Sequence, residues 1–149
     1  MNEKLISKNR KAFHEFHILD RFEAGIELTG SEVKSLREGR GNLKEAYVTI
    51  RDNEAILIGA HFSPYSHTGY QGHEPKRDRR LLLNRKEIRK LAQQTAEKGL
   101  TIVPLKLYFK GGWVKVEIAL AKGKKTYDKK EALKRKDIQR ETDREMRRY

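Results

Sequence analysis

The chain has 149 residues, 37% of them charged, and its 34 Lys and Arg against 21 Asp and Glu give a net charge of +13. This surplus predicts a polyanionic partner, nucleic acid before an anionic membrane. The absence of cysteine excludes disulfides and thiolate metal sites, and no apolar run approaches transmembrane length, so we expect a soluble, cytosolic protein with no membrane partner.

The first part of the chain predicts a flexible end followed by a long strand. Residues 1–12 are polar and basic, and we expect them to be flexible. From Phe16 to Leu28, apolar residues occupy even positions and polar residues odd ones, except at Leu19-Asp20, where the order is reversed. We therefore expect a bulge there. A long, bent first strand is typical of a small closed barrel.

Two segments carry the signals of a capped helix. Thr29 and Glu32 have the spacing of a capping box, and Asn84 and Glu87 repeat that spacing later in the chain. Gly99 is expected to end the second helix. Asn84 therefore has a complete structural explanation as a helix cap.

Two hairpins are predicted from period-two alternation. The first joins residues 47–51 to 55–60, and the second joins 105–110 to 114–120 through a Gly-Gly turn. Three residues are expected to share one face of the second hairpin: Leu105, Leu107 and Phe109. The order of strands and helices predicts a mainly β protein with flanking helices, built as a small antiparallel barrel of the oligonucleotide-binding type over residues 13–122.

The C-terminal segment differs from the rest in charge density. Residues 122–149 carry 12 Lys and Arg against 6 Asp and Glu. Helix-spaced charge pairs recur there, but no continuous apolar stripe accompanies them. We expect residues 123–149 to be a basic tail that is disordered when free and helical on an anionic surface. The alternative is a solubilising or dispensable extension; the spaced acids and Tyr127 favour an RNA-binding tail.

The remaining candidate sites each have an ordinary alternative. Arg77, Arg79 and Arg80 form a second basic cluster, or a solvated loop beside a buried strand. Glu23 could merely pair with a lysine across strands. Metal binding at the evenly spaced His61, His67 and His73 is not expected, because neither cysteine nor helical spacing supports it. No catalytic motif is visible, so we expect neither an enzyme nor a cofactor. An RNA-processing nuclease with carboxylate-bound metal and a generic ribosomal or messenger-binding barrel remain alternatives.

Three long stretches resemble one family. FEAGIELTGSEVKSLREGRGNLKEAYV, HEPKRDRRLLLN and VKVEIALAKGKKTYDKK are similar to the SsrA-binding protein family, also called small protein B, and the resemblance runs from about Asn9 to Lys130. It implies binding to the tRNA-like domain of transfer-messenger RNA (tmRNA) and rescue of stalled ribosomes by trans-translation. Elongation factor Tu with GTP would bring in the charged RNA. The tail would fold in the empty messenger channel of the small subunit, beyond the decoding centre.

The resemblance also implies positions of contact. Its motifs place RNA contacts at Glu23, Leu82 and Asn84. Basic residues expected to contact the RNA as well are Arg77, Arg79, Arg80, Lys115, Lys122, Lys124 and Lys125. Tail residues expected at the ribosomal decoding centre are Tyr127, Asp128, Lys129, Lys130, Lys134 and Arg135.

Overall fold

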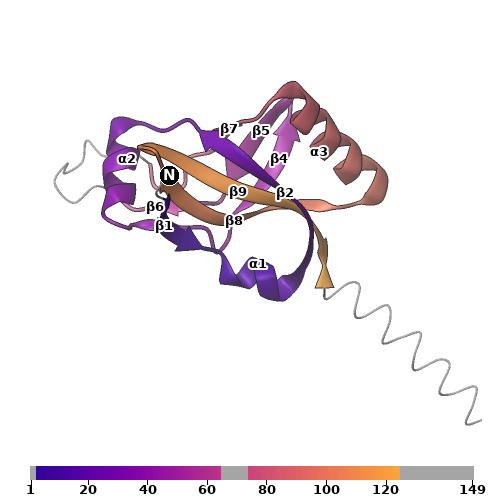
Figure 1. Ribbon diagram of the computed structural model, residues 1–149, viewed down its shortest axis with the longest axis horizontal. Helices are drawn as coiled ribbons and strands as arrows, with labels where there is room; N and C mark the ends of the chain where they lie inside the picture. Colours follow the sequence, from indigo (N-terminus) through magenta and orange to yellow (C-terminus); the bar gives the residue numbers. More distant parts are fainter. Residues whose placement is uncertain (1–2, 65–73, 125–149) are drawn as a thin grey trace, which may run out of the picture.

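A computed structural model describes residues 3–64 and 74–124 of the chain, in which strands dominate and helices lie at the margins (Figure 1). The predictions for the tail from Lys125 onward, and for His67 and His73, lie outside the described residues. In chain order the elements are β1 (Glu3–Lys8), α1 (Arg10–Glu15), β2 (Phe16–Ile26), α2 (Gly30–Arg37), β3 (Gly41–Asn42), β4 (Tyr47–Arg51), β5 (Glu54–Ile58), β6 (His61–Phe62), β7 (Arg79–Leu82), α3 (Arg85–Lys98), β8 (Thr101–Lys110) and β9 (Trp113–Gly123).

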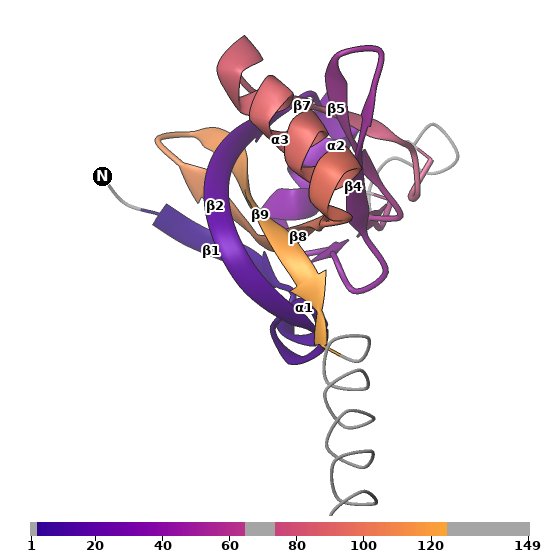
Figure 2. The same cartoon turned by 90° about the vertical axis from the view of Figure 1, so that its right-hand side faces the viewer.

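The main sheet closes on itself. Neighbouring strands run in the order β8–β4–β5–β7–β2–β9, and β9 pairs back with β8, while β1 adds to β8 from outside the ring. All of these pairings are antiparallel. The long β2 curves around the ring, as Figure 2 shows. The predicted mainly β, antiparallel barrel with flanking helices is confirmed.

One apolar cluster fills the ring. Val116 and Ile118 of β9 are fully buried in it, together with Leu36 of α2 and Leu91 of α3. The two helices lie at opposite ends of the ring (Figures 1 and 2). Both helices begin with the predicted capping box, formed in full at Thr29 and at Asn84. Each helix thus closes one end of the barrel with a leucine in the core.

Two bulges move side chains from one face of the sheet to the other. The register of β2 against β9 shifts between Ile18 and Asp20, which leaves the intervening Leu19 exposed and confirms the predicted bulge. A second shift, in β8 after Pro104, was not predicted. Because of it, Leu105 packs with Ala12 of α1 in a second cluster, whereas Leu107 points into the main core. The expectation that Leu105 shares a face with Leu107 is therefore wrong.

The N-terminal segment is ordered within the described residues, which corrects the prediction that residues 1–12 are flexible. β1 pairs along β8, from Glu3 opposite Lys110 to Lys8 opposite Lys106. Asn9 then caps α1 and donates from Nδ2 to the carbonyl oxygen of Pro104 at 2.9 Å. The polar sequence misled the prediction, because an edge strand is held by backbone hydrogen bonds and needs no apolar pattern.

Candidate nucleic-acid interface

Residues from three distant stretches of the chain meet at Gly25 on the outer face of β2. Gly25 pairs with Leu82 of β7 on one side and with Lys115 of β9 on the other. A Cβ added to Gly25 would lie 3.3 Å from the Cβ of Leu82, so the leucine side chain occupies the space above the glycine. Leu82 remains 47% exposed. The three motifs that carried the resemblance thus share one surface, which we call the β2 patch and define as Glu23, Leu82, Tyr108, Lys110 and Lys115.

Glu23 connects β2 to β8 across the intervening β9. Its carboxylate accepts a hydrogen bond from the Tyr108 hydroxyl at 2.5 Å and from the Lys110 ammonium at 3.2 Å. The hydrogen bond from Tyr108 lowers the pKa of Glu23 below its ordinary value, burial opposes this, and Lys110 and Lys115 lower it further. Glu23 therefore stays ionised. It also pairs with a lysine on another strand, Lys110, as the alternative interpretation of this residue predicted.

Tyr108 is the buried member of the patch. Burial, and then its hydrogen bond to Glu23, raise the pKa of the Tyr108 hydroxyl far above its ordinary value. The phenol consequently keeps its proton and always acts as the donor toward Glu23. Glu23 is thereby held in one position on the surface, with its remaining lone pairs available to donors from a ligand.

Asn84 lies at the surface, two residues after Leu82, and begins α3. Its Oδ1 accepts the backbone N–H of Glu87 at 2.9 Å, and the Glu87 carboxylate accepts the backbone N–H of Asn84 at 3.2 Å. The Nδ2 donor has no partner among the described residues. The cap therefore uses one end of the side-chain amide and leaves the other end able to donate to a ligand.

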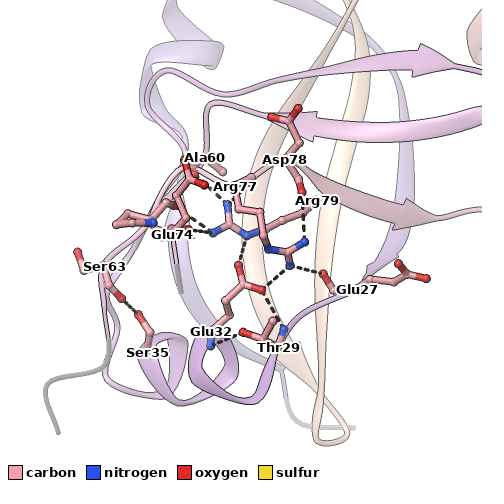
Figure 3. A network of polar contacts seen from close by, with 11 residues as sticks. Glu27, Thr29, Glu32, Ser35, Ala60, Ser63, Glu74, Arg77, Asp78 and Arg79 are labelled. Carbon is pink, nitrogen blue, oxygen red and sulfur yellow. Dashed lines mark hydrogen bonds and ion pairs between the residues drawn. The ribbon is translucent and has the colours of Figure 1, made fainter. Parts of the chain in front are cut away.

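The predicted basic cluster at residues 77–80 divides into three environments, and Figure 3 shows those of Arg77 and Arg79. Arg79 is fully buried, and its guanidinium donates to Glu32 and to the carbonyl oxygens of Ala60 and Pro75. Arg77 is half-buried and pairs with the same carboxylate at 2.5 Å. Arg80 alone is exposed. The predicted RNA contact at Arg79 is corrected, because a guanidinium with no exposed surface cannot reach a phosphate.

Glu32 neutralises this buried charge. Burial raises the pKa of Glu32, but hydrogen bonds from Arg77, from the Thr29 backbone and from Arg79 outweigh it, so the pKa lies below its ordinary value. Burial also lowers the pKa of Arg79, and the ion pair with Glu32 counteracts that effect. The carboxylate that the sequence assigned only to a helix cap therefore also anchors the segment before β7.

Of the remaining predicted lysines, Lys115 and Lys122 lie on β9 and Lys124 directly follows it. Lys115 is half-buried and belongs to the β2 patch. Lys122, seven residues further along the strand, is exposed and pairs with His17 of β2. Lys124 donates from Nζ to the Phe13 carbonyl oxygen of α1 at 3.2 Å. The structure thus separates Lys122 and Lys124 from the patch, and Lys125 lies outside the described residues.

A groove of about 480 Å³ adjoins the patch beside Tyr108. Its charged lining residues are Lys8, Arg21, Lys106, Glu3 and Glu117, and Glu117 pairs with both Arg21 and Lys106. The Lys8 ammonium and the Arg21 guanidinium both lie over the Phe13 ring, at 5.2 and 5.8 Å from its centroid. The groove leads from the patch toward Phe13 of α1, with cations and carboxylates both in its lining.

Sequence reasoning did not select Tyr108 and Lys110, although a signal was present. Both lie on the polar face of the predicted hairpin, where an aromatic residue between lysines is a common pattern in RNA-binding strands. Within residues 3–64 and 74–124, no group of three or more His, Cys, Asp or Glu could hold a metal ion. No helix in that part of the chain is long and apolar enough to cross a membrane.

Comparison with known proteins decides the family. The family described as SmpB protein matches residues 6–148, almost the whole chain. The chain belongs to the SmpB protein family. The family assignment confirms the resemblance seen in the three sequence stretches.

Individual relatives agree with this assignment. The SsrA-binding protein of Syntrophobacter fumaroxidans is 57% identical over 141 residues, covering 95% of this chain and 88% of the relative. The SsrA-binding protein of Trichodesmium erythraeum is 53% identical, covering 99% and 95%. A chain of the solved structure described as "tmRNA-SmpB: a journey to the center of the bacterial ribosome" is 43% identical with a TM-score of 0.67, covering 79% of this chain and 83% of that one.

Proposed function

We propose that this chain binds the tRNA-like domain of tmRNA and brings it to stalled bacterial ribosomes for trans-translation. The relatives are named for binding SsrA RNA, and the solved neighbour belongs to a tmRNA complex with the bacterial ribosome. The observation that carries the proposal is the pairing of Gly25 with both Leu82 and Lys115, which assembles the β2 patch from the three family motifs.

The composition of the patch suits a structured RNA. Lys110 and Lys115 offer ammonium groups for phosphates, which bind RNA without reading its sequence. Glu23 offers acceptors for 2′-hydroxyl or base amino groups, and Leu82 offers an apolar contact. Asn84 adds an amide donor beside them. A protein that recognises the shape of a tRNA-like fold needs this mixture more than it needs base-specific contacts.

The tail has a separate role in this proposal. Residues 123–149 would order as a helix in the empty messenger channel. The tail residues that would contact the ribosome at the decoding centre are Tyr127, Asp128, Lys129, Lys130, Lys134 and Arg135. Phosphates of the channel would replace the apolar packing that the tail sequence lacks. Elongation factor Tu with GTP joins through the RNA, and the protein acts in the cytoplasm as a binding protein without catalysis.

Truncation tests the division between barrel and tail. A chain ending at Lys124 keeps every described residue, including the bond from Lys124 to Phe13. It should retain most of its affinity for the isolated tRNA-like RNA in gel shifts at fixed salt, yet fail to support peptide tagging on stalled ribosomes. Full-length Glu23→Ala is the reciprocal control, with weakened RNA binding. Loss of nearly all binding on truncation, or equal binding to an unrelated structured RNA, contradicts the proposal.

A further inference from the structure

The tip of the β8–β9 hairpin presents a tryptophan to solvent. Trp113 is the first residue of β9 and is 75% exposed, more than any other large exposed hydrophobic side chain in the described part of the protein. It follows Gly111 and Gly112, whose φ values of 58° and 82° form the tight turn. An aromatic ring held at a rigid turn outside the core is a surface that a ligand can use.

Trp113 lies on the same face as the β2 patch. It pairs with Lys110 of β8, whose ammonium binds Glu23. Lys115, two residues along β9, pairs with Tyr108 and Gly25. Residues two apart in a strand point to the same side, and the intervening Val114 is buried in the core. The indole therefore extends the patch to the end of the hairpin, one step beyond Lys115.

The charge around Trp113 indicates which kind of ligand would bind this surface. The flanking residues on its face are Lys110 and Lys115, and the whole chain carries +13, so a second copy of this chain would be repelled. RNA satisfies both features at once, because lysines bind its phosphates and an aromatic ring stacks on its bases. Within the described residues, no hydrogen bond or cation–π contact occupies the indole.

We propose that Trp113 stacks on an unpaired nucleobase of the RNA bound at the β2 patch. This inference rests on the proposed function and refines it: the hairpin tip would favour RNA with an unpaired nucleotide beside a helical region over a plain duplex. Because every base has a π-face, the contact tolerates different bases. The patch would thus bind by charge and shape, while Trp113 selects for unpaired structure.

Trp113 is its own reporter, because it is the chain's only tryptophan. Indole fluorescence of the full-length protein, excited where tyrosine does not absorb, therefore reports on this position alone. Titration with a tRNA-like RNA that keeps its unpaired loops should quench the emission with the affinity seen by gel shift. A blunt RNA duplex of the same length should bind more weakly and leave the emission nearly unchanged.

Three substitutions separate stacking from general apolarity. Trp113→Ala and Trp113→Leu should each weaken binding to the looped RNA by about tenfold, whereas Trp113→Phe should retain most of it because a phenyl ring also stacks. Binding of the blunt duplex should be equal in all three variants and the parent. The exposed position predicts unchanged melting temperatures, which serve as the folding control.

The outcomes distinguish this inference from the proposed function. Tight binding of looped RNA without quenching, or full binding by Trp113→Leu, overturns the stacking contact while leaving the proposed function intact. Absence of RNA binding by the parent protein overturns the proposed function itself. Equal quenching by blunt duplex and looped RNA overturns the preference for unpaired nucleotides.

Discussion

The Nε–H of Arg79 on β7 donates to the carboxylate of Glu32 on α2, and both side chains are fully buried. The same carboxylate accepts the backbone N–H of Thr29 at 2.9 Å and a guanidinium bond from Arg77 at 2.5 Å. One acid therefore closes a helix cap and neutralises two arginines. The pair joins α2 to β7, the strand that carries Leu82 and leads into Asn84. It therefore helps to hold Leu82 of the β2 patch in position.

Breaking this pair from one side should be costly. Arg79→Met leaves the buried Glu32 carboxylate with Arg77 as its one remaining cationic partner among the described residues. We therefore expect a loss of about 3 kcal/mol in the free energy of unfolding, the lower end of the range for breaking a buried ion pair. The double variant with Glu32→Met should recover part of that loss, because it removes the buried charge. Arg80→Met is the matched control, expected to change stability by less than about 1 kcal/mol because its ion pairs are exposed. Urea unfolding measures the free energy of unfolding of the parent and of the three variants. Equal stability of Arg79→Met and the double variant contradicts the explanation.

The same carboxylate should make stability depend on acid pH. The folded-state pKa of Glu32 lies below the ordinary value of 4.5, so its contribution is fully present above pH 4.5 and is lost as the pH falls through the folded-state pKa. Glu32→Gln removes this titration. The stability difference between parent and variant should therefore be constant near neutrality and shrink below pH 4.5. Urea midpoints measured across acid pH check this, and a difference independent of pH contradicts it.

Glu23 should matter for RNA more than for folding. Its side chain is exposed and its partners are Tyr108 and Lys110, so Glu23→Ala should weaken binding to the tRNA-like RNA several-fold while barely moving the melting temperature. Gel shifts and thermal melts provide the two readouts. Glu27→Ala is the control, since Glu27 is an exposed acid paired with Arg80 outside the patch. If Glu23→Ala binds RNA like the parent, Glu23 serves only as a cross-strand partner.

Leu82 should depend on the glycine beneath it. Gly25→Val places a branched side chain where the Leu82 side chain lies, 3.3 Å from its Cβ, and should displace it. Gly25→Val and Leu82→Ala should consequently weaken RNA binding to a similar degree, and the double variant should add little, because both changes remove the same contact. Binding isotherms of the three variants test this. Additive losses would show that Gly25 acts independently of Leu82.

The tail prediction concerns residues 123–149. Proline at Leu133 costs about 3 kcal/mol within a helix, because it removes a backbone donor and clashes with the preceding turn. Leu133→Pro should spare binding to free RNA and sharply reduce peptide tagging on stalled ribosomes, whereas Leu133→Ala should do much less. Full rescue by Leu133→Pro would show that the tail acts as an extended polycation.

The sequence alone determined those features whose causes are close together in the chain. Both capping boxes, the turn at Asp52 and Asn53 with φ of 52° and 62°, and the bulge at Leu19 follow from neighbouring residues. The family motifs also predicted Glu23, Leu82 and Asn84 as site residues, and Lys115 was among the basic residues expected to contact the RNA as well. Local backbone preferences and side-chain alternation are short-range effects, so a short window of sequence carries them.

Only the tertiary structure decided which charges are buried and which are available. Arg79 and Arg80 are adjacent and chemically identical, yet strand pleating points one into the domain and the other out. The inward arginine is tolerated because Glu32, 47 residues away in the chain, neutralises it. The unpredicted bulge in β8 likewise depends on α1, where Asn9 binds the carbonyl oxygens of Pro104 and Leu105. The partners that satisfy a buried charge or an irregular strand meet only when the chain folds, and no local pattern records them.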